Sequence, residues 1–362
     1  MKRQLYISQI LIAVAMGMMV SGLASSVSAA EPYKIINNSQ TMGTGRIDYV
    51  YADSEGRRVY VPRGNQVLVF DLDTLKSVGA INDSGGHGVA VDPNSHHGFS
   101  SRKPITMFDT TTLAKIKDIQ VEGNPDGILY EPLTQKVYVF SHSAPNVTVI
   151  DPKDGSITGT IDLGGAPEQA ASDEQGHMYV DLEDENKIAV VDVKALKKTG
   201  EYSLEGKGAG PGGLGLDAKN RILFAFCHEP ATCVVLGADD GKILATLPIG
   251  SGTDGGGFNP HTMEAFSSQG DGTLTIIREN SPTSFEVEQT VQTKPRAKTC
   301  SLDTKNDHIV LIAVEPSPTP AGTPEAAQAP ATPPANAEQG RGGWRGGRGG
   351  GPGLLDILVV GH

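Results

Sequence analysis

A repeated phrase constrains this chain more than any other feature. It combines a short apolar strand, a second strand of the type apolar-Tyr-Val and a third of the type Val-x-Val-Ile-Asp. The turn residue after the first strand recurs every 39 to 44 residues, at Asp53, Asp92, Glu131, Asp173, Asp217, Asn259 and Asp303. A period near 40 with several short strands in each unit is typical of β-propeller blades. Because single blades cannot bury their own faces, the repeat favours one closed domain.

Each unit divides into four expected strands. In the second unit they cover 88–91, 97–100, 105–108 and 116–119, from the innermost strand outward. The second and third strands are apolar at successive positions, as in the pair Val190–Val191, which indicates strands covered on both faces by neighbouring blades. We therefore predict an all-β, seven-bladed propeller with four-stranded antiparallel blades.

The seventh unit is interrupted. Its first two strands are expected around 298–302 and at 309–314, and residues 315–352 are then rich in Pro, Ala and Gly. This composition cannot bury a core, so we predict a disordered insertion there. An apolar strand follows at 354–360, and a lone strand at 33–37 precedes the first unit. We expect these terminal strands to complete blade seven and close the ring, which gives a propeller of 31–314 plus 353–362.

Residues 1–30 have the features of a signal peptide. Lys2 and Arg3 form a basic start, an apolar stretch covers 7–20, and small residues lead up to Ala30. The apolar run is short for a membrane span, so we expect cleavage, no transmembrane segment afterwards and a periplasmic or secreted protein. The alternative is a retained anchor helix. Removing Lys2 and Arg3 with no acidic residue changes the formal net charge from −12 to −14, which opposes general nucleic-acid or anionic-membrane binding.

The third unit contains the stretch Lys-Val-Tyr-Val-Phe-Ser-His-Ser-Ala-Pro-Asn-Val-Thr-Val-Ile-Asp at 136–151. With this repeat the chain resembles the YncE-like (YVTN) family of secreted bacterial seven-bladed propellers, over essentially all of 33–314 and 353–362. No copy carries the literal Tyr-Val-Thr-Asn, and the nearest copies are 60–63 and 138–141. The resemblance implies the fold. That family is similar to lactonase-type propellers in architecture, and architecture does not transfer chemistry.

Several other propeller chemistries lack their residues here. The one tryptophan, Trp344, falls in the expected insertion, which argues against tryptophan-rich WD-type repeats. The chain has no Cys-x-x-Cys-His haem attachment, no Gly-x-Ser-x-Gly elbow and no His-Glu-x-x-His zinc helix. We therefore expect a binding protein rather than an enzyme.

Polar residues begin six of the seven innermost strands, and Gly212 takes this position in the fifth unit. In a four-stranded blade these positions converge on one mouth of the central channel, and we expect a ligand site there made of Arg46, Asp48, His87, Asp126, Glu168, Asp254 and Lys298. Carboxylates with a histidine suit a divalent cation, for which the candidate ligands are His87, Asp126, Glu168 and Asp254. The alternative is a neutral solvated rim in which opposite charges cancel. No nucleophile–base pair can be recognised, although Asp126 or Glu168 beside His87 could act as a general base.

The loops between second and third strands lie at the same end. They carry Arg63, Arg102, Lys103, His142, 183–185, His228 and Glu229, which we interpret mainly as a solvated face. The expected insertion also emerges beside the mouth. Its Arg341, Arg345 and Arg348 with Trp344 resemble an Arg-Gly segment that binds polyanions, although a passive loop is the simpler reading.

The three cysteines allow one disulfide. Cys227 and Cys233 flank an expected hairpin tip, where an oxidising compartment would permit a bridge, and two packed thiols are the alternative. We interpret Cys300 as a buried small hydrophobe.

The prediction is thus a monomeric, exported scaffold that binds a protein or small polar ligand at the channel mouth, with a divalent cation as the candidate cofactor. One alternative is a lactonase-like or other hydrolase at the mouth. The other is a binder of nucleic acid or polysaccharide that uses the arginines of the insertion.

Overall fold

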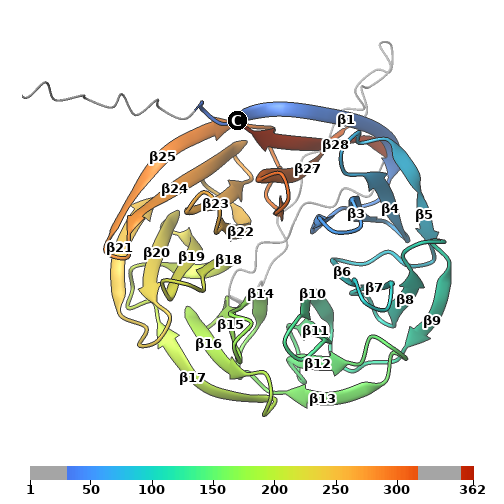
Figure 1. The fold of residues 1–362 in the computed structure, drawn as a ribbon, viewed down its shortest axis with the longest axis horizontal. Coiled ribbons are helices and arrows are strands. Elements are labelled where there is room, and N and C mark those ends of the chain that lie inside the picture. The colour runs from blue at the N-terminus through green and yellow to red at the C-terminus, as the bar shows by residue number, and fades with distance from the viewer. Residues whose placement is uncertain (1–30, 317–351) are drawn as a thin grey trace, which may run out of the picture. The chain divides into compact units, whose positions relative to one another are not determined.

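The computed structural model describes residues 31–316 and 352–362. These residues form seven four-stranded antiparallel sheets arranged around a ring (Figure 1). The blades belong to a single unit that begins at Pro32. The predicted signal peptide at 1–30 lies outside the described residues, and so do residues 317–351 of the predicted insertion, with Trp344 and the three arginines.

The first four blades follow the sequence order from the channel outward. Blade one contains β2 (Tyr51–Asp53), β3 (Arg58–Arg63), β4 (Gln66–Asp71) and β5 (Ser77–Asn82). Blade two contains β6 (Val89–Asp92), β7 (His97–Ser100), β8 (Ile105–Asp109) and β9 (Lys115–Ile119). Blade three contains β10 (Pro125–Glu131), β11 (Lys136–Ser141), β12 (Val147–Ile150) and β13 (Ile157–Ile161). Blade four contains β14 (Pro167–Ser172), β15 (His177–Leu182), β16 (Lys187–Asp192) and β17 (Lys197–Ser203).

The last three blades complete the ring. Blade five contains β18 (Ala209–Asp217), β19 (Ile222–Glu229), β20 (Thr232–Gly237) and β21 (Ile243–Pro248). Blade six contains β22 (Thr253–Asn259), β23 (Glu264–Gln269), β24 (Thr273–Ser281) and β25 (Ser284–Gln292). Blade seven contains β26 (Cys300–Asp303), β27 (His308–Pro316), β28 (Pro352–Gly361) and β1 (Lys34–Thr44).

Blade seven confirms that the terminal strands close the ring. The C-terminal strand β28 pairs with β27 through Val359 and Val310, and with the N-terminal strand β1 through Val359 and Asn37 (Figure 1). Strand β27 continues two residues beyond the expected end at Val314, and β28 begins at Pro352. The ring closure leaves no unpaired edge on this blade's third strand.

The hydrophobic core lies between blades. Because successive strand residues point to opposite faces, Val59 and Val61 of β3 pack toward blade seven while Tyr60 packs toward blade two. The described residues form seven buried clusters of this kind, one at each blade interface. This packing explains why the second and third strands are apolar at successive positions.

The recurring acidic or amide residue is a turn cap. Its side-chain oxygen accepts hydrogen bonds from backbone N–H groups two to four residues later, as Asp53 does from Gly56 at 2.9 Å and Asp173 from Gly176 at 3.0 Å. These caps are buried, with Glu131 fully so, and they satisfy N–H groups of the turns. Among the described ranges, no helix has the length and hydropathy needed to cross a membrane.

Candidate functional site

The channel mouth brings together two predicted residues from neighbouring blades. Asp48 precedes β2, and His87 precedes β6; the backbone N–H of Tyr49 donates to the His87 carbonyl at 3.1 Å. This contact places the Asp48 Oδ2 atom 2.7 Å from His87 Nδ1. The Asp48 carbonyl accepts a further hydrogen bond from Thr299 Oγ1 at 2.7 Å, so the backbone on both sides of Asp48 is fixed.

Blades three and four supply the next part of the cluster. Asp126 on β10 lies with its Oδ1 atom 3.3 Å from His87 Nδ1. Glu168 on β14 accepts a hydrogen bond from the Tyr49 hydroxyl at 2.5 Å, although Tyr49 belongs to blade one. The structure therefore places Asp48, His87, Asp126 and Glu168 in one site, as the sequence predicts.

His142 is the member that the sequence reasoning assigned to the solvated face. It lies in the turn between β11 and β12, with its Nε2 atom 3.0 Å from Glu168 Oε2 and 3.4 Å from Asp126 Oδ2. The available signal was its place in a second-to-third-strand loop at the mouth end. Two groups of side chains could accordingly hold a metal ion, Asp48–His87–Asp126 and Asp126–His142–Glu168.

Burial changes the acid–base properties of this cluster. Asp126 and Glu168 are each only 9% exposed. The pKa of Asp126 rises to about 6, because burial removes water from the carboxylate and the Glu168 charge lies nearby. The hydrogen bond to Glu168 raises the pKa of His142 to about 9, and the hydrogen bond to Asp48 raises the pKa of His87 despite its burial.

The remaining predicted site residues come from blades one, six and seven. Lys298 forms an ion pair with Asp254 and lies 3.8 Å from Asp48 Oδ1. Asp254 belongs to neither of the two groups found among the described residues, and its role as a metal ligand stays a prediction. Arg46 is exposed at the entrance to blade one, where its carbonyl accepts from the Gly64 N–H at 3.1 Å.

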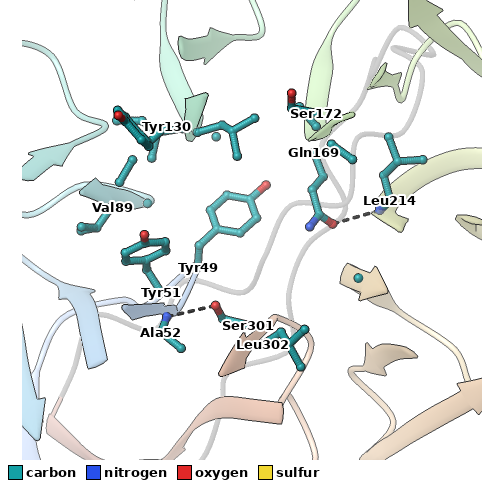
Figure 2. A pocket seen from close by; sticks show the side chains of 18 of the residues that line it. Tyr49, Tyr51, Ala52, Val89, Tyr130, Gln169, Ser172, Leu214, Ser301 and Leu302 are labelled. Atoms are coloured by element: carbon teal, nitrogen blue, oxygen red, sulfur yellow. Dashed lines mark hydrogen bonds between the residues drawn. The ribbon is translucent and has the colours of Figure 1, made fainter. Parts of the chain in front are cut away.

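Beneath the mouth the channel contains a cavity of about 740 Å³. Tyr49, Tyr51, Tyr130, Gln169 and Leu214 are among its lining residues, and Figure 2 shows the Tyr49 side chain pointing into it. The Gln169 side chain crosses to other blades: its Oε1 atom accepts from Leu214 N at 3.0 Å and from Gly256 N at 3.1 Å (Figure 2 shows the Leu214 bond). Tyr49, Glu168 and Gln169 all line this cavity, so Glu168 belongs both to the cavity wall and to the cluster at the mouth.

Glycines bring the inner strands of blades five and six close together. A β-carbon on Gly213 would lie 2.9 Å from the carbonyl carbon of Gly255, and one on Gly215 would lie 2.7 Å from the Gly257 oxygen. Side chains at Gly213 and Gly215 would therefore force β18 and β22 apart. This close approach holds Gly256 within reach of Gln169.

The cysteine prediction needs correction. Strand register pairs Cys233 with Phe226, and Cys227 with Thr232, so the two cysteines are offset by one residue. Cys227 consequently packs between blades four and five, whereas Cys233 packs between blades five and six. Both are buried free thiols, which corresponds to the alternative of two packed cysteines. Cys300 is only partly buried and lines the channel cavity.

Comparison with known proteins identifies the architecture. No family model matches the chain, and no curated protein matches its sequence. Solved structures do match. A chain of the mitotic checkpoint complex has a TM-score of 0.64 at 11% identity, with 83% of this chain and 96% of that one covered. The structure of U3-55K has a TM-score of 0.65 at 9% identity, with 88% of this chain and 98% of that one covered. The RRP9 WD40 repeats have a TM-score of 0.65 at 10% identity, with 88% of this chain and 97% of that one covered. Identities this low show a shared fold alone: the chain is a seven-bladed β-propeller of the architecture also used by WD40 repeats.

Proposed function

We propose that this chain is a binding protein whose channel mouth takes a small cationic ligand, in the first place a divalent metal ion. The observation that carries the proposal is the meeting of Asp126 and Glu168 with His87 and His142. Carboxylates buried to this extent are stable when a cation or hydrogen-bond donor compensates their charge. Carboxylate oxygens and imidazole nitrogens are also the ligands that divalent cations use in proteins.

The setting of the cluster supports a binding role. Asp126 and Glu168 lie on inner strands, and His87 directly precedes one. His142 lies in the short turn between β11 and β12. The blades therefore hold the backbone of all four residues. Sites built on rigid elements lose little conformational entropy on binding. Hydrogen bonds from the Tyr49 hydroxyl to Glu168, and from the Leu214 and Gly256 N–H groups to Gln169, hold these two side chains from other blades.

Two further assignments belong to this proposal. The repeat pattern supports membership of the YncE-like family. The signal-peptide-like segment at 1–30 supports export to the periplasm or the medium. An exported propeller with a ligand at its mouth would present the surrounding loops, including 183–185 and His228, to a protein partner.

The test is stabilisation by ligand. Melting curves of metal-free protein are recorded with Zn²⁺, Co²⁺, Mn²⁺, Ca²⁺ and a linear diamine. A ligand at a hundred times its dissociation constant should stabilise the fold by about 2.7 kcal/mol. Asp126→Ala and Glu168→Ala should lose the shift, while Glu286→Ala on the exposed outer strand β25 should keep it. A panel in which no cation shifts the wild-type curve contradicts the proposal and favours the neutral rim.

A hydrolase remains the second candidate because of Asp126. Its pKa near 6 leaves it mostly ionised at neutral pH beside His87, which suits a general base. Hydrolysis of a simple lactone by the purified protein, lost in Asp126→Asn with the fold retained, would establish this activity. Binding without turnover would support the binding role instead.

A further inference from the structure

The two carboxylate oxygens of Asp126 face two different histidines. Oδ1 lies 3.3 Å from His87 Nδ1, and Oδ2 lies 3.4 Å from His142 Nε2. A carboxylate in this position can give one oxygen to each of two neighbouring ions.

The same nitrogen of each histidine also lies close to a second carboxylate. His87 Nδ1 lies 2.7 Å from Asp48 Oδ2, and His142 Nε2 lies 3.0 Å from Glu168 Oε2. The cluster thus consists of two similar halves, Asp48–His87 and His142–Glu168, joined by Asp126. The first half comes from blades one and two, the second from blades three and four, and Asp126 from blade three.

The spacing of these atoms fits metal coordination. Zinc-ligand distances of about 2.0–2.2 Å place neighbouring ligand atoms about 3–3.5 Å apart. The four separations given above run from 2.7 to 3.4 Å, and the ligand atoms of each half lie within 4.8 Å of one another. One imidazole in each half favours zinc, cobalt or a related ion over calcium and magnesium.

An unpartnered atom points to a missing ligand. Asp126 Oδ1 is buried, and no hydrogen-bond donor satisfies it among the described residues. The side chains of Asp126 and Glu168 are 13% and 11% exposed, so water compensates little of their charge. A buried carboxylate oxygen without a donor is costly unless an ion completes its coordination.

The outer contacts of the cluster hold the ligands in place. The Tyr49 hydroxyl donates to Glu168 Oε1, and the opposite oxygen, Oε2, faces His142. The His87 backbone N–H donates to the Ser101 carbonyl at 3.1 Å. Such second contacts orient metal ligands before the ion arrives.

We infer that the channel mouth is a dinuclear site for divalent transition-metal ions, with Asp126 bridging one ion held by Asp48 and His87 and another held by His142 and Glu168. This inference rests on the proposed cation-binding function and specifies its ligand as a pair of ions. Three carboxylates against two divalent ions leave a net positive charge, which would attract an anionic or oxygen-donor ligand to the open side of the site.

The experiment counts metal ions. Metal-free full-length protein is titrated with Co²⁺ by calorimetry and visible absorption, and its Zn²⁺ content is measured after dialysis. We expect two equivalents in the wild type, and one each in His87→Ala and His142→Ala. His261→Ala is the matched control, because His261 pairs with Asp307 at the opposite end of the propeller, and it should keep two equivalents.

A spectroscopic readout tests the bridge. Two Co²⁺ ions joined by one carboxylate should couple, which lowers the electron paramagnetic resonance intensity per ion below that of either single-histidine variant. Asp126→Asn should lose this coupling. Circular dichroism of each variant confirms that the fold is retained.

The outcomes separate the two claims. One equivalent in the wild type, or two equivalents without coupling, overturns the bridged pair and leaves a cation-binding mouth. No bound transition metal overturns the dinuclear site, while the diamine and calcium melting curves decide the proposed function independently. A one-ion loss in His261→Ala equal to that in His87→Ala would also overturn the assignment of ligands.

Discussion

The Tyr49 hydroxyl of blade one donates a hydrogen bond to the Glu168 carboxylate of blade four, 119 residues further along the chain, at 2.5 Å. This bond crosses the channel and joins two blades that are not neighbours in the ring. It also fixes one oxygen of Glu168, which leaves the other directed to His142. The hydrogen bond from Tyr49 therefore restrains the Glu168 side chain at the centre of the ring.

Tyr49→Phe should therefore weaken the proposed metal binding by about 10- to 100-fold, because removing a hydrogen-bond partner of a metal ligand has this order of effect. The free energy of unfolding should fall by about 1.5–3 kcal/mol from the lost hydrogen bond to a charged group. Cobalt titration and urea unfolding measure the two effects. Tyr51→Phe is the control. Tyr51 lines the same cavity, and in the part of the chain that the structure describes it forms no hydrogen bond with Glu168. Equal losses in both variants would contradict the role of Tyr49.

A buried ion pair secures the closing strand. Asp356 on β28 is fully buried, and its Oδ1 atom accepts from Lys294 Nζ at 2.7 Å and from Gln40 Nε2 at 2.6 Å. Lys294→Met should lower the free energy of unfolding by about 3–5 kcal/mol, because a buried carboxylate loses its cation. Lys305→Met, which removes an exposed pair with Glu55, should cost less than about 1 kcal/mol. Urea unfolding measures both variants, and similar losses of unfolding free energy in Lys294→Met and Lys305→Met would contradict this prediction.

Glu279 should make stability depend on pH. It is 4% exposed at the interface of blades five and six, and burial together with nearby Asp217 raises its pKa to about 7 from 4.5. The folded state therefore holds a proton that the unfolded chain releases, so this stabilisation is complete below pH 4.5 and is lost as pH rises through 7. The wild type should lose about 1–3 kcal/mol relative to Glu279→Gln between pH 5 and 8.

The measurement for Glu279 is the difference in unfolding free energy between wild type and variant across that range. Glu286→Gln changes an exposed residue, so its unfolding free energy should depend on pH in the same way as that of the wild type. A difference for Glu279→Gln that does not change with pH would show that Glu279 is ionised throughout.

Cys227 and Cys233 should both remain free thiols in protein purified without a reductant. They face opposite sides of blade five, and burial raises the thiol pKa of each, so native protein should react slowly with alkylating reagents. Alkylation in denaturant should then modify all three cysteines of the chain. A peptide map of that protein that contains a Cys227–Cys233 bridge would contradict this register.

The fold was predictable because its cause is local and repeated. Each turn cap of the Asp53 type accepts hydrogen bonds from backbone N–H groups within four residues. The second and third strands of each blade are covered on both faces by neighbouring blades with the same repeat. Periodicity therefore identifies the blades, and an incomplete seventh unit flanked by two lone strands is enough to predict ring closure. The convergence of Asp48, His87, Asp126 and Glu168 followed from the same geometry, because equivalent positions in a closed ring lie at one end.

Other features depend on contacts that no periodicity encodes. His142 reaches Asp126 and Glu168 because its hairpin turns inward, and Asp254 is drawn to Lys298 instead of joining the cluster. Cys227 and Cys233 are offset by one residue in strand register, so their side chains point to opposite faces of blade five. The sequence by itself determined the ring and the residues at its mouth, since both arise from a repeat along the chain. Only the tertiary structure decided which side chains meet there, because their distances depend on how seven blades pack together.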